Sequence, residues 1–492
     1  MLPAGAPPGP PVPEDLPLDA KALAVLAISL EAGWEAHATE LTRRGLGAVV
    51  LLASALADPA RAAEVVADMQ TAAGQSPVAA PLLVGADEEG GRVSRLPRGP
   101  ASLPGAAALG AAADLALCEE AGRATALRLA ACGIHWDLAP VCDLAGADNP
   151  GLNGRAFSRE PEACARLAGA FARGLAAGGA IACAKHFPGH GGTTGDSHHA
   201  LPVLAGGPEL IAARRPFAAA VADGIPMVMI GHLLVPDLDQ RWPASLSPAA
   251  YGVLRQELGF DGVVVTDSLG MRGCLEAAGG IGAAAIQALA AGADLILVGP
   301  GPDAHLQAHA AIMAAVGAGV LPAGRLDDAV RRLLALKQRH GLARRALPDG
   351  AAAPHLLARP ADSALARRIA RAAVAELRPG PACPQPEVLV SGATTPKALV
   401  AAAQAWWPQA ALRSDGSGPW LSLGEATHLL IAPPVPPGVP AGRLLAAWDA
   451  MPASLEALLT SATDPTSPTG RPAALLPWGE SHLLWSFGRE AI

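Results

Sequence analysis

The chain of 492 residues is poor in aromatic and in charged side chains, which make up 3% and 16% of the sequence. Its 36 Lys and Arg residues are thinly spread, and 44 Asp and Glu residues outnumber them, so the formal net charge is −8. A protein that binds nucleic acid or an anionic membrane needs a basic stripe or a polybasic segment, and the sequence has neither. We therefore expect no nucleic-acid partner and no membrane partner.

Other absences concern the start of the chain and its cysteines. The first residues are rich in proline and lack the positive and apolar regions of a secretory signal. No run of about 18 strongly apolar residues suggests a membrane span. The seven cysteines are odd in number and lack CxxC spacing, so neither a disulfide framework nor a structural zinc site is expected. These features predict a cytoplasmic protein without a structural metal.

Short apolar runs alternate with stretches of helical period between Ala22 and about Val298, in a chain whose 51% hydrophobic content is globular. Continuous apolar runs bounded by glycine fit strands that are buried on both faces. Eight such runs predict a (β/α)8 TIM-like barrel, although a doubly wound sheet would give a similar alternation. The predicted strands are Ala24–Ile28, Ala48–Leu52, Leu82–Val84, Ile134–Leu138, Ile181–Ala184, Met227–Ile230, Val263–Val265 and Asp294–Val298, and helices are predicted at Asp58–Ala73, Pro161–Ala177 and Gly280–Ala291.

The composition divides the chain into four predicted parts. Residues 1–20 are expected to be disordered or extended, residues 21–345 to form the barrel, and residues 346–386 to form a helical linker. Residues 387–492 hold six of the nine Trp residues and predict a small α/β domain without a visible catalytic set. Helices are expected at Leu326–Arg345, Ala361–Glu376 and Pro396–Trp406, and strands at Glu387–Val390 and His428–Ile431.

Polar residues directly follow five of the predicted strands. A single strand-end carboxylate is more often a helix cap than a catalytic group, but five such positions in register favour a site. A barrel gathers its chemistry at the carboxyl ends of its strands, so these residues predict an active face. They are Asp87-Glu88-Glu89, Asp143, Lys185-His186, Gly231-His232 and Thr266-Asp267.

Two segments hold most of the candidate chemistry. The first runs from Lys185 to His198 and contains a lysine, an aspartate and three histidines among many glycines. Asp196 and His198 are two residues apart, close enough for the carboxylate to fix the orientation and tautomer of the imidazole. The second segment is a strand that delivers one carboxylate, Asp267, at its end.

Together these segments resemble glycoside hydrolase family three, and specifically its β-N-acetylglucosaminidase branch, over roughly residues 20 to 340. Four separate motifs stand in the order that is characteristic of this branch. They are the turn Gly85–Arg92, the segment Arg155-Ala156-Phe157 with Pro161, the segment Lys185–His198, and the strand end Thr266–Met271.

The resemblance implies a retaining exo-β-N-acetylglucosaminidase that needs no cofactor and acts on small carbohydrates, such as cell-wall fragments in the family's bacterial members. Asp267 would be the nucleophile, and Asp196 with His198 would form the acid/base dyad. Low aromatic content also argues against a long polysaccharide cleft and for a small exo-acting pocket. The residues that would hold the hydroxyls of the terminal sugar are Asp87, Arg95, Arg155, Lys185 and His186.

Three alternatives follow from the same residues. A histidine acid/base lacks the permanent negative charge of glutamate, so phosphate could replace water as the acceptor in a phosphorylase. A metal-dependent hydrolase would use some of the clustered side chains as ligands. A non-catalytic barrel is less expected, because the reacting groups Asp196, His198 and Asp267 are intact. The candidate metal ligands are His186, His190, His198, His199 and Asp196.

Neighbouring polar residues are expected to have structural roles. Glu88 and Glu89 would shape their turn, Asp143 would be a structural partner at a strand end, and His190 would bond within its loop. For His232, contact with substrate and packing beneath it are equally expected. Gly231 stands where alanine is common in the family, and Glu88 where glutamine is frequent.

Overall fold

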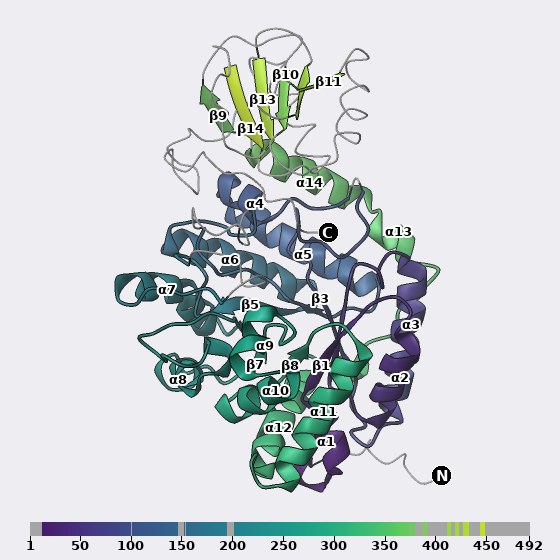
Figure 1. The fold of residues 1–492 in the computed structure, drawn as a ribbon. Coiled ribbons are helices and arrows are strands. Elements are labelled where there is room, and N and C mark those ends of the chain that lie inside the picture. The colour runs from purple at the N-terminus through teal and green to yellow at the C-terminus, as the bar shows by residue number, and fades with distance from the viewer. Residues whose placement is uncertain are drawn as a thin grey trace.

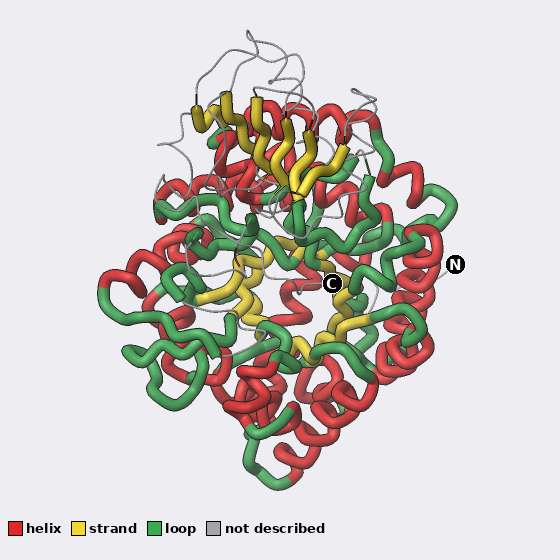
Figure 2. Tube along the Cα trace, turned by 45° about the horizontal axis from the view of Figure 1, so that its top comes forward, coloured by secondary structure: helices red, strands yellow, loops and turns green. Residues whose placement is uncertain are grey.

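A computed structural model describes residues 12–99, 101–145, 152, 154–193 and 201–373, together with the backbone of six later strands. Eight parallel strands form one sheet in the order β7-β6-β5-β4-β3-β2-β1-β8. The two outer strands meet through a parallel bridge between Val265 and Leu295, so the sheet closes into the ring that Figure 2 shows. The predicted (β/α)8 barrel is confirmed, and the doubly wound alternative is excluded because its sheet would stay open.

Each barrel strand overlaps the apolar run that predicted it, and helices surround the ring (Figure 1). The strands are β1 Leu26–Leu30, β2 Ala48–Leu51, β3 Leu83–Ala86, β4 Trp136–Asp137, β5 Ile181–Phe187, β6 Met227–Ile230, β7 Val263–Thr266 and β8 Ile296–Val298. The main helices of the barrel are α1 Leu18–Ala24, α2 Glu35–Arg44, α3 Pro59–Gly74, α4 Ala106–Ala112, α5 Leu115–Ala131, α6 Pro161–Ala177, α7 Pro208–Ala222, α8 Pro248–Gly252, α9 Arg272–Ala278, α10 Ile281–Ala291, α11 Pro302–Gly317 and α12 Ala323–Arg339.

Local sequence signals set the starts of several helices. The Asp58 carboxylate accepts the N–H groups of residues 60 and 61 at 3.0 and 3.2 Å and caps α3. Asp114 caps α5 in the same way, at 2.8 and 3.2 Å. Proline stands at the first helical position of α3, α6, α7 and α11, where its missing N–H costs no hydrogen bond.

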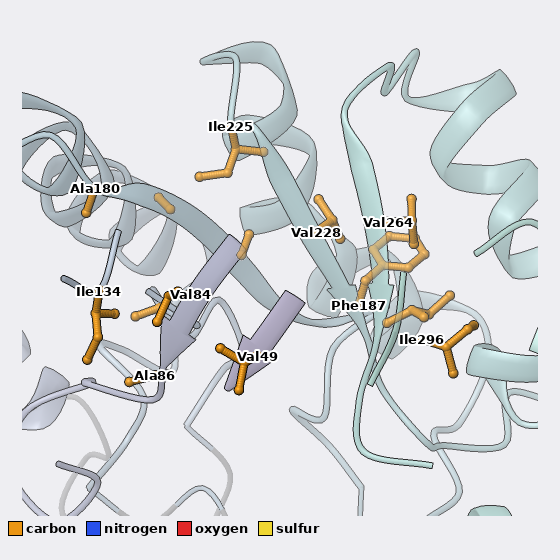
Figure 3. Packing of buried hydrophobic residues seen from close by; sticks show 14 of the residues in the cluster. Val49, Val84, Ala86, Ile134, Ala180, Phe187, Ile225, Val228, Val264 and Ile296 are labelled. Atoms are coloured by element: carbon orange, nitrogen blue, oxygen red, sulfur yellow. The ribbon is translucent and has the colours of Figure 1, made fainter. Parts of the chain in front are cut away.

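The strand side chains alternate between two hydrophobic layers. Val49, Val84, Val228, Val264 and Ile296 face outward and belong to the layer that packs under the helices (Figure 3). Their neighbours face the barrel axis, because successive strand residues point to opposite faces. Leu333 and Leu336 of α12, with Leu342, pack against this inner layer near the start of β7 and close the amino-terminal end of the barrel. The inner-layer strand residues include Ala48, Val50, Leu83, Trp136, Ile181, Cys183, Val263 and Val265.

Several predicted boundaries differ from the structure. A 3-10 turn at Pro13–Asp15 and the first three residues of α1 lie inside the part expected to be disordered or extended, because apolar side chains of α1 are buried. The predicted helix Leu326–Arg345 ends at Arg339, just before Gly341, whose φ of 62° is left-handed. Two helices, α13 Ala353–Leu357 and α14 Pro360–Ala373, lie in the predicted linker.

A second sheet follows α14 in the order β11-β12-β10-β13-β14-β9. Its first strand in the chain, β9, lies before the predicted domain boundary at residue 387. The helix predicted to continue to residue 376 ends at Ala373 instead, and β9 begins at Ala375. The predicted strands Glu387–Val390 and His428–Ile431 are confirmed, and the predicted helix Pro396–Trp406 lies outside the described residues. The six strands are β9 Ala375–Arg378, β10 Glu387–Val390, β11 Ala411–Ser414, β12 Pro419–Ser422, β13 Thr427–Ile431 and β14 Arg443–Ala447.

Two further expectations concern cysteines and membrane spans. The six cysteines in the described part of the chain are free and buried. Of the described helices, none is long and apolar enough to cross a membrane by itself, and only the bent pair α9 and α10 passes that test jointly.

His135 ties strand β3 to the start of β4 at a buried position. Its Nε2 accepts the N–H of Val84 at 3.3 Å, and its Nδ1 lies 3.1 Å from the carbonyl oxygen of Gly133. Because a carbonyl only accepts, Nδ1 carries the proton and the ring is neutral. Burial lowers the pKa of His135 to about 4.

We expect His135 to make the fold sensitive to acid. The unfolded chain binds a proton on this ring near the ordinary pKa of 6.5, whereas the folded protein binds it only near pH 4. The stabilisation is therefore complete above pH 6.5 and is lost as the pH falls towards 4, by about 3 kcal/mol at most. Urea unfolding at pH 7, 5.5 and 4 should show a smaller loss in His135→Gln than in the wild type. The same pH dependence in both proteins would contradict this role.

Candidate active site

Of the predicted site residues in the described part of the chain, Asp87, Lys185, His186 and Asp267 lie at the carboxyl ends of strands, and Arg95 and Arg155 lie in the segments that follow β3 and β4. Lys185 stands two residues after Cys183 in β5, and Asp267 stands two residues after Val265 in β7. Since Cys183 and Val265 belong to the inner layer, this spacing places the polar residues on the side of the barrel axis. Asp87 stands four residues after Leu83, another inner-layer residue, and so points to the same side. Asp196 and His198 lie outside the described residues.

An ionic cluster forms the floor of the site. The Lys185 ammonium group lies 2.7 Å from Asp87 Oδ1 and 2.6 Å from Glu89 Oε1, and the lysine side chain is only 1% exposed. Arg155 binds both oxygens of Glu89 through Nε and Nη2, each at 2.8 Å. The Arg95 guanidinium completes the group at 3.6 Å from Asp87 Oδ2. Four of the five predicted sugar-binding residues therefore lie together, and Glu89 joins them.

The two carboxyl groups of this cluster and the Lys185 amine are held in their charged forms. Burial raises the pKa of Glu89, but the charges of Arg155 and Lys185 outweigh it and hold this pKa far below its usual range. Burial also opposes ionisation of Asp87, and Lys185 with Arg95 reverses that effect. Burial lowers the pKa of Lys185, whereas its two carboxylate partners raise it above its ordinary value. Charged donors and acceptors bind hydroxyl groups more strongly than neutral ones.

Arg95 and Asp87 keep hydrogen-bonding capacity for a ligand. Arg95 Nε is buried and has no partner among the described residues. The Arg95 side chain is 34% exposed and the Asp87 side chain 20% exposed, in contrast to the closed position of Lys185. The accessible parts of these two side chains can bond to a ligand hydroxyl, whereas the buried Nε of Arg95 is out of its reach.

Both Glu88 and Glu89 were expected to shape their turn. Glu88 does so, whereas Glu89 also forms ion pairs with Lys185 and Arg155. Glu88 Oε1 accepts the hydroxyl of Ser94 at 2.8 Å, and Oε2 accepts the N–H groups of Arg95 and Leu96 at 2.8 and 3.1 Å. Burial raises the pKa of Glu88. Glu89 instead supplies the countercharge of two cations. The sequence signal that could have indicated this role was the prediction of two cations, Lys185 and Arg155, for one site, because buried cations need a carboxylate partner.

Asp143 orients His186. Its Oδ2 lies 2.7 Å from His186 Nδ1, and both of its oxygens lie 3.3 Å from the His186 N–H. Asp143 Oδ1 also accepts the N–H of His190 at 2.7 Å. Burial raises the pKa of Asp143, but His186 outweighs it and keeps the carboxylate ionised, so His186 Nδ1 is the donor. These contacts confirm a structural Asp143. His190 also bonds within its loop, as predicted, through its carbonyl oxygen, which accepts the Thr193 hydroxyl at 2.8 Å.

Asp267 ends β7 as an ionised carboxylate. Its Oδ1 accepts the N–H of Ser268 at 2.7 Å, and its own N–H donates to the carbonyl oxygen of Ile230 in β6 at 2.9 Å. Burial opposes its charge, but His186, His232 and the Ser268 N–H outweigh this and lower the pKa of Asp267 to about 2. The ionised form of a carboxyl group is the form that can act as a nucleophile.

His232 packs beneath the site. It is fully buried, with Nε2 at 2.8 Å from the Ser268 carbonyl oxygen and Nδ1 at 2.7 Å from Ser245 Oγ. Both ring nitrogens thus have protein partners, which decides between the two roles expected from the sequence. His232 supports the backbone that follows Asp267.

Gly231 makes room for two histidines. A methyl group at this position would lie 2.9 Å from His186 Cβ and 3.1 Å from His190 Nε2. Their rings are 5.5 Å apart in an edge-to-face arrangement. Glycine in place of the family's common alanine therefore fits the position of these rings.

The metal-hydrolase alternative concerns side chains that are only partly described. Among the residues that the structure describes, no group of three or more His, Cys, Asp or Glu is placed to hold a metal ion. His186 and His190 both bond to Asp143. The other candidate ligands Asp196, His198 and His199 lie outside the described residues.

Residues 18–336 match the family model described as the glycosyl hydrolase family 3 N terminal domain. A β-hexosaminidase of Neisseria meningitidis is 40% identical over 232 residues, which are 45% of this chain and 64% of that relative. This chain thus spans less than two thirds of that relative's length.

Two solved structures are similar to this chain. A glycoside hydrolase family 3 β-N-acetylglucosaminidase from Paenibacillus is 30% identical with a TM-score of 0.80, and the match covers 91% of this chain and 97% of that one. A β-N-acetylhexosaminidase from Beutenbergia cavernae is 32% identical with a TM-score of 0.59, covering 66% of this chain and 99% of the other.

We expect the ionic cluster to contribute strongly to stability through Glu89. Glu89→Gln removes one of the two carboxylates that contact the buried Lys185 and the carboxylate that binds Arg155 through two hydrogen bonds, so it should lower the free energy of unfolding by about 3–5 kcal/mol. Glu88→Gln is the matched control, because Glu88 bonds only to neutral groups and an amide oxygen can replace its carboxylate. Its cost should be about 1 kcal/mol. Urea unfolding of both variants tests this, and equal losses would contradict it.

Proposed function

The chain belongs to glycosyl hydrolase family 3, and from this membership we propose that it is a retaining exo-β-N-acetylglucosaminidase. The observation that carries the proposal is Asp267, an ionised carboxylate at the end of β7 on the same side of the barrel as the Lys185 cluster. The relatives named β-hexosaminidase and β-N-acetylglucosaminidase support the substrate class.

In the proposed reaction, Asp267 attacks the anomeric carbon of the terminal sugar. A C–O ester bond forms to the enzyme as the glycosidic C–O bond breaks, and the leaving oxygen takes a proton from the imidazolium of His198. In the second step water attacks the same carbon, His198 takes a proton from that water, and the carboxylate of Asp267 leaves. Two inversions at one carbon give overall retention.

The acid/base role of His198 rests on its chemistry and on its place in the sequence. An imidazole with a pKa near neutrality can donate a proton in one step and accept one in the next. Asp196, two residues earlier, would fix the tautomer and stabilise the imidazolium. The dyad follows β5 by nine residues and lies in the segment 194–200, which is outside the described residues.

The ionic cluster is proposed to bind the terminal sugar. Asp87 and Arg95 keep exposed oxygen and nitrogen atoms, and Arg155 and Lys185 stabilise the carboxylates beside them. His186, oriented by Asp143, presents its second ring nitrogen as a further hydrogen-bonding group. Such a set suits an uncharged ligand with several hydroxyl groups.

We propose terminal β-linked N-acetylglucosamine of cell-wall muropeptides, or of related small glycosides, as the natural substrate. Phosphorolysis on the same site is the alternative, since a histidine acid/base does not repel phosphate as a glutamate would. The two reactions share the glycosyl-enzyme and differ only in the acceptor of the second step.

Release of p-nitrophenol from its β-N-acetylglucosaminide tests the reaction. The wild type should be active with and without EDTA, whereas Asp267→Asn should lose at least about 10³-fold in kcat/KM, because an amide cannot attack the anomeric carbon. After incubation with a slowly hydrolysed substrate, a mass spectrum of the protein should show the sugar attached to Asp267.

Adding phosphate separates the two acceptors. Unchanged rates with free N-acetylglucosamine as the product support hydrolysis, and a faster reaction that yields the sugar phosphate supports phosphorolysis. An inactive wild type, or a fully active Asp267→Asn, would refute the proposed nucleophile or substrate. Loss of activity with EDTA would favour the metal-dependent alternative.

The acid role of His198 predicts a dependence on the leaving group. A poor leaving group, such as the second sugar of a disaccharide, needs protonation of its oxygen, whereas p-nitrophenol leaves largely without it. His198→Gln should therefore lose about 10²-fold more kcat/KM on a disaccharide than on the p-nitrophenyl glycoside, with a flattened pH profile. His199→Gln is the matched control and should behave like the wild type. Equal losses on both substrates would argue against His198 as the acid.

A further inference from the structure

Asp137 is a buried carboxyl group in the middle of an apolar strand run. It ends β4, is fully buried, and contacts the turn that follows β3. Its Oδ1 accepts the N–H of Glu88 at 3.1 Å, and its Oδ2 has no partner among the described residues. No role was predicted for it, because it stands within a predicted strand rather than after one.

The hydrogen bond to Glu88 fixes the backbone on one side of Asp87. On the other side, the carbonyl oxygen of Ala86 accepts the N–H of Leu138 at 3.0 Å, and Ala86 pairs with Asp137 in the register of β3 and β4. Asp87 is therefore the residue between two backbone groups that are both held by β4. One of these bonds is part of the strand ladder, and the other depends on a single side chain.

The surroundings of Asp137 favour a neutral acid. A buried carboxylate is stable only with a cation or several donors, and among the described residues this carboxyl has one backbone donor and no ion pair. Burial, with the neighbouring carboxylates Glu88 and Asp87, raises the pKa of Asp137 well above its usual range. A neutral acid can accept the Glu88 N–H without competing with Asp87 and Glu89 for the charge of Lys185.

We propose that Asp137 is a positioning residue that holds Asp87 in place for sugar binding by accepting the Glu88 N–H. Its effect on turnover rests on the proposed function, because Asp87 is the sugar-binding residue through which it acts. Its effect on the turn itself does not depend on any activity.

Two substitutions separate shape from charge. Asp137→Asn keeps the size and the accepting oxygen, so kcat/KM should stay within about threefold of the wild type. Asp137→Ala leaves the Glu88 N–H without its acceptor and lets the turn shift, and a shift of about 1 Å at a substrate-positioning group can cost about 10²-fold in rate. A similar loss in both variants would overturn the neutral-acid assignment.

A double-mutant cycle with Asp87→Asn tests whether Asp137 acts through Asp87. If it does, Asp137→Ala should cost about 10²-fold in the wild-type background and less than about threefold in the Asp87→Asn background. Equal losses in the two backgrounds would overturn the positioning role and would indicate a general structural defect.

Amide hydrogen exchange at Glu88 gives a measurement that needs no turnover. The Glu88 N–H should exchange slowly in the wild type and in Asp137→Asn, and at least about tenfold faster in Asp137→Ala. Unchanged protection in Asp137→Ala would refute the hydrogen bond as the cause. If the wild type hydrolyses no β-N-acetylglucosaminide but the exchange result holds, the proposed function fails while the role of Asp137 in the turn stands.

Discussion

The ammonium group of Lys185 between Asp87 and Glu89 is the interaction on which the rest of the site depends. A nearly inaccessible cation is tolerated because two carboxylates lie within 2.7 Å of it. Glu89 in turn binds Arg155, and Asp87 lies near Arg95, so residues from separate loops converge on one charge. The cluster therefore acts both as a tie between β3 and β5 and as the surface offered to a polar ligand.

The barrel supplies the geometry that makes this convergence possible. Inward-facing positions of β5 and β7 are apolar along the strand and become polar two residues later, at Lys185 and Asp267. The same alternation that fills the barrel with hydrophobic side chains thus aims the polar groups at one end of its axis. Leu333 and Leu336 of α12 fill the opposite end. The polar site therefore lies directly above the apolar side chains that fill the barrel, along the same axis.

Carboxyl groups in this region differ in their burial and in their partners, and these differences agree with the proposed division into one nucleophile and several supporting groups. Asp267 has one backbone donor and stays half-buried, whereas Asp143 is fully buried with both oxygens used on the histidine segment. Glu88 bonds its own turn, and Asp137 bonds the peptide after Asp87. Strand-end position alone could not separate these roles. The sequence identified the carboxyls, and the contacts assign their tasks.

The sequence by itself determined the eight strands and the residues that end them, because apolar periodicity and strand-end polarity are local properties of the chain. Helix starts at Asp58 and Asp114 are local in the same sense. Only the tertiary structure decided that β7 meets β8, that Glu89 neutralises two cations, and that both nitrogens of His232 are occupied. Asp137 was missed for the same reason. These outcomes depend on pairings between residues far apart in the chain, which folding brings within hydrogen-bonding distance and which local patterns do not encode.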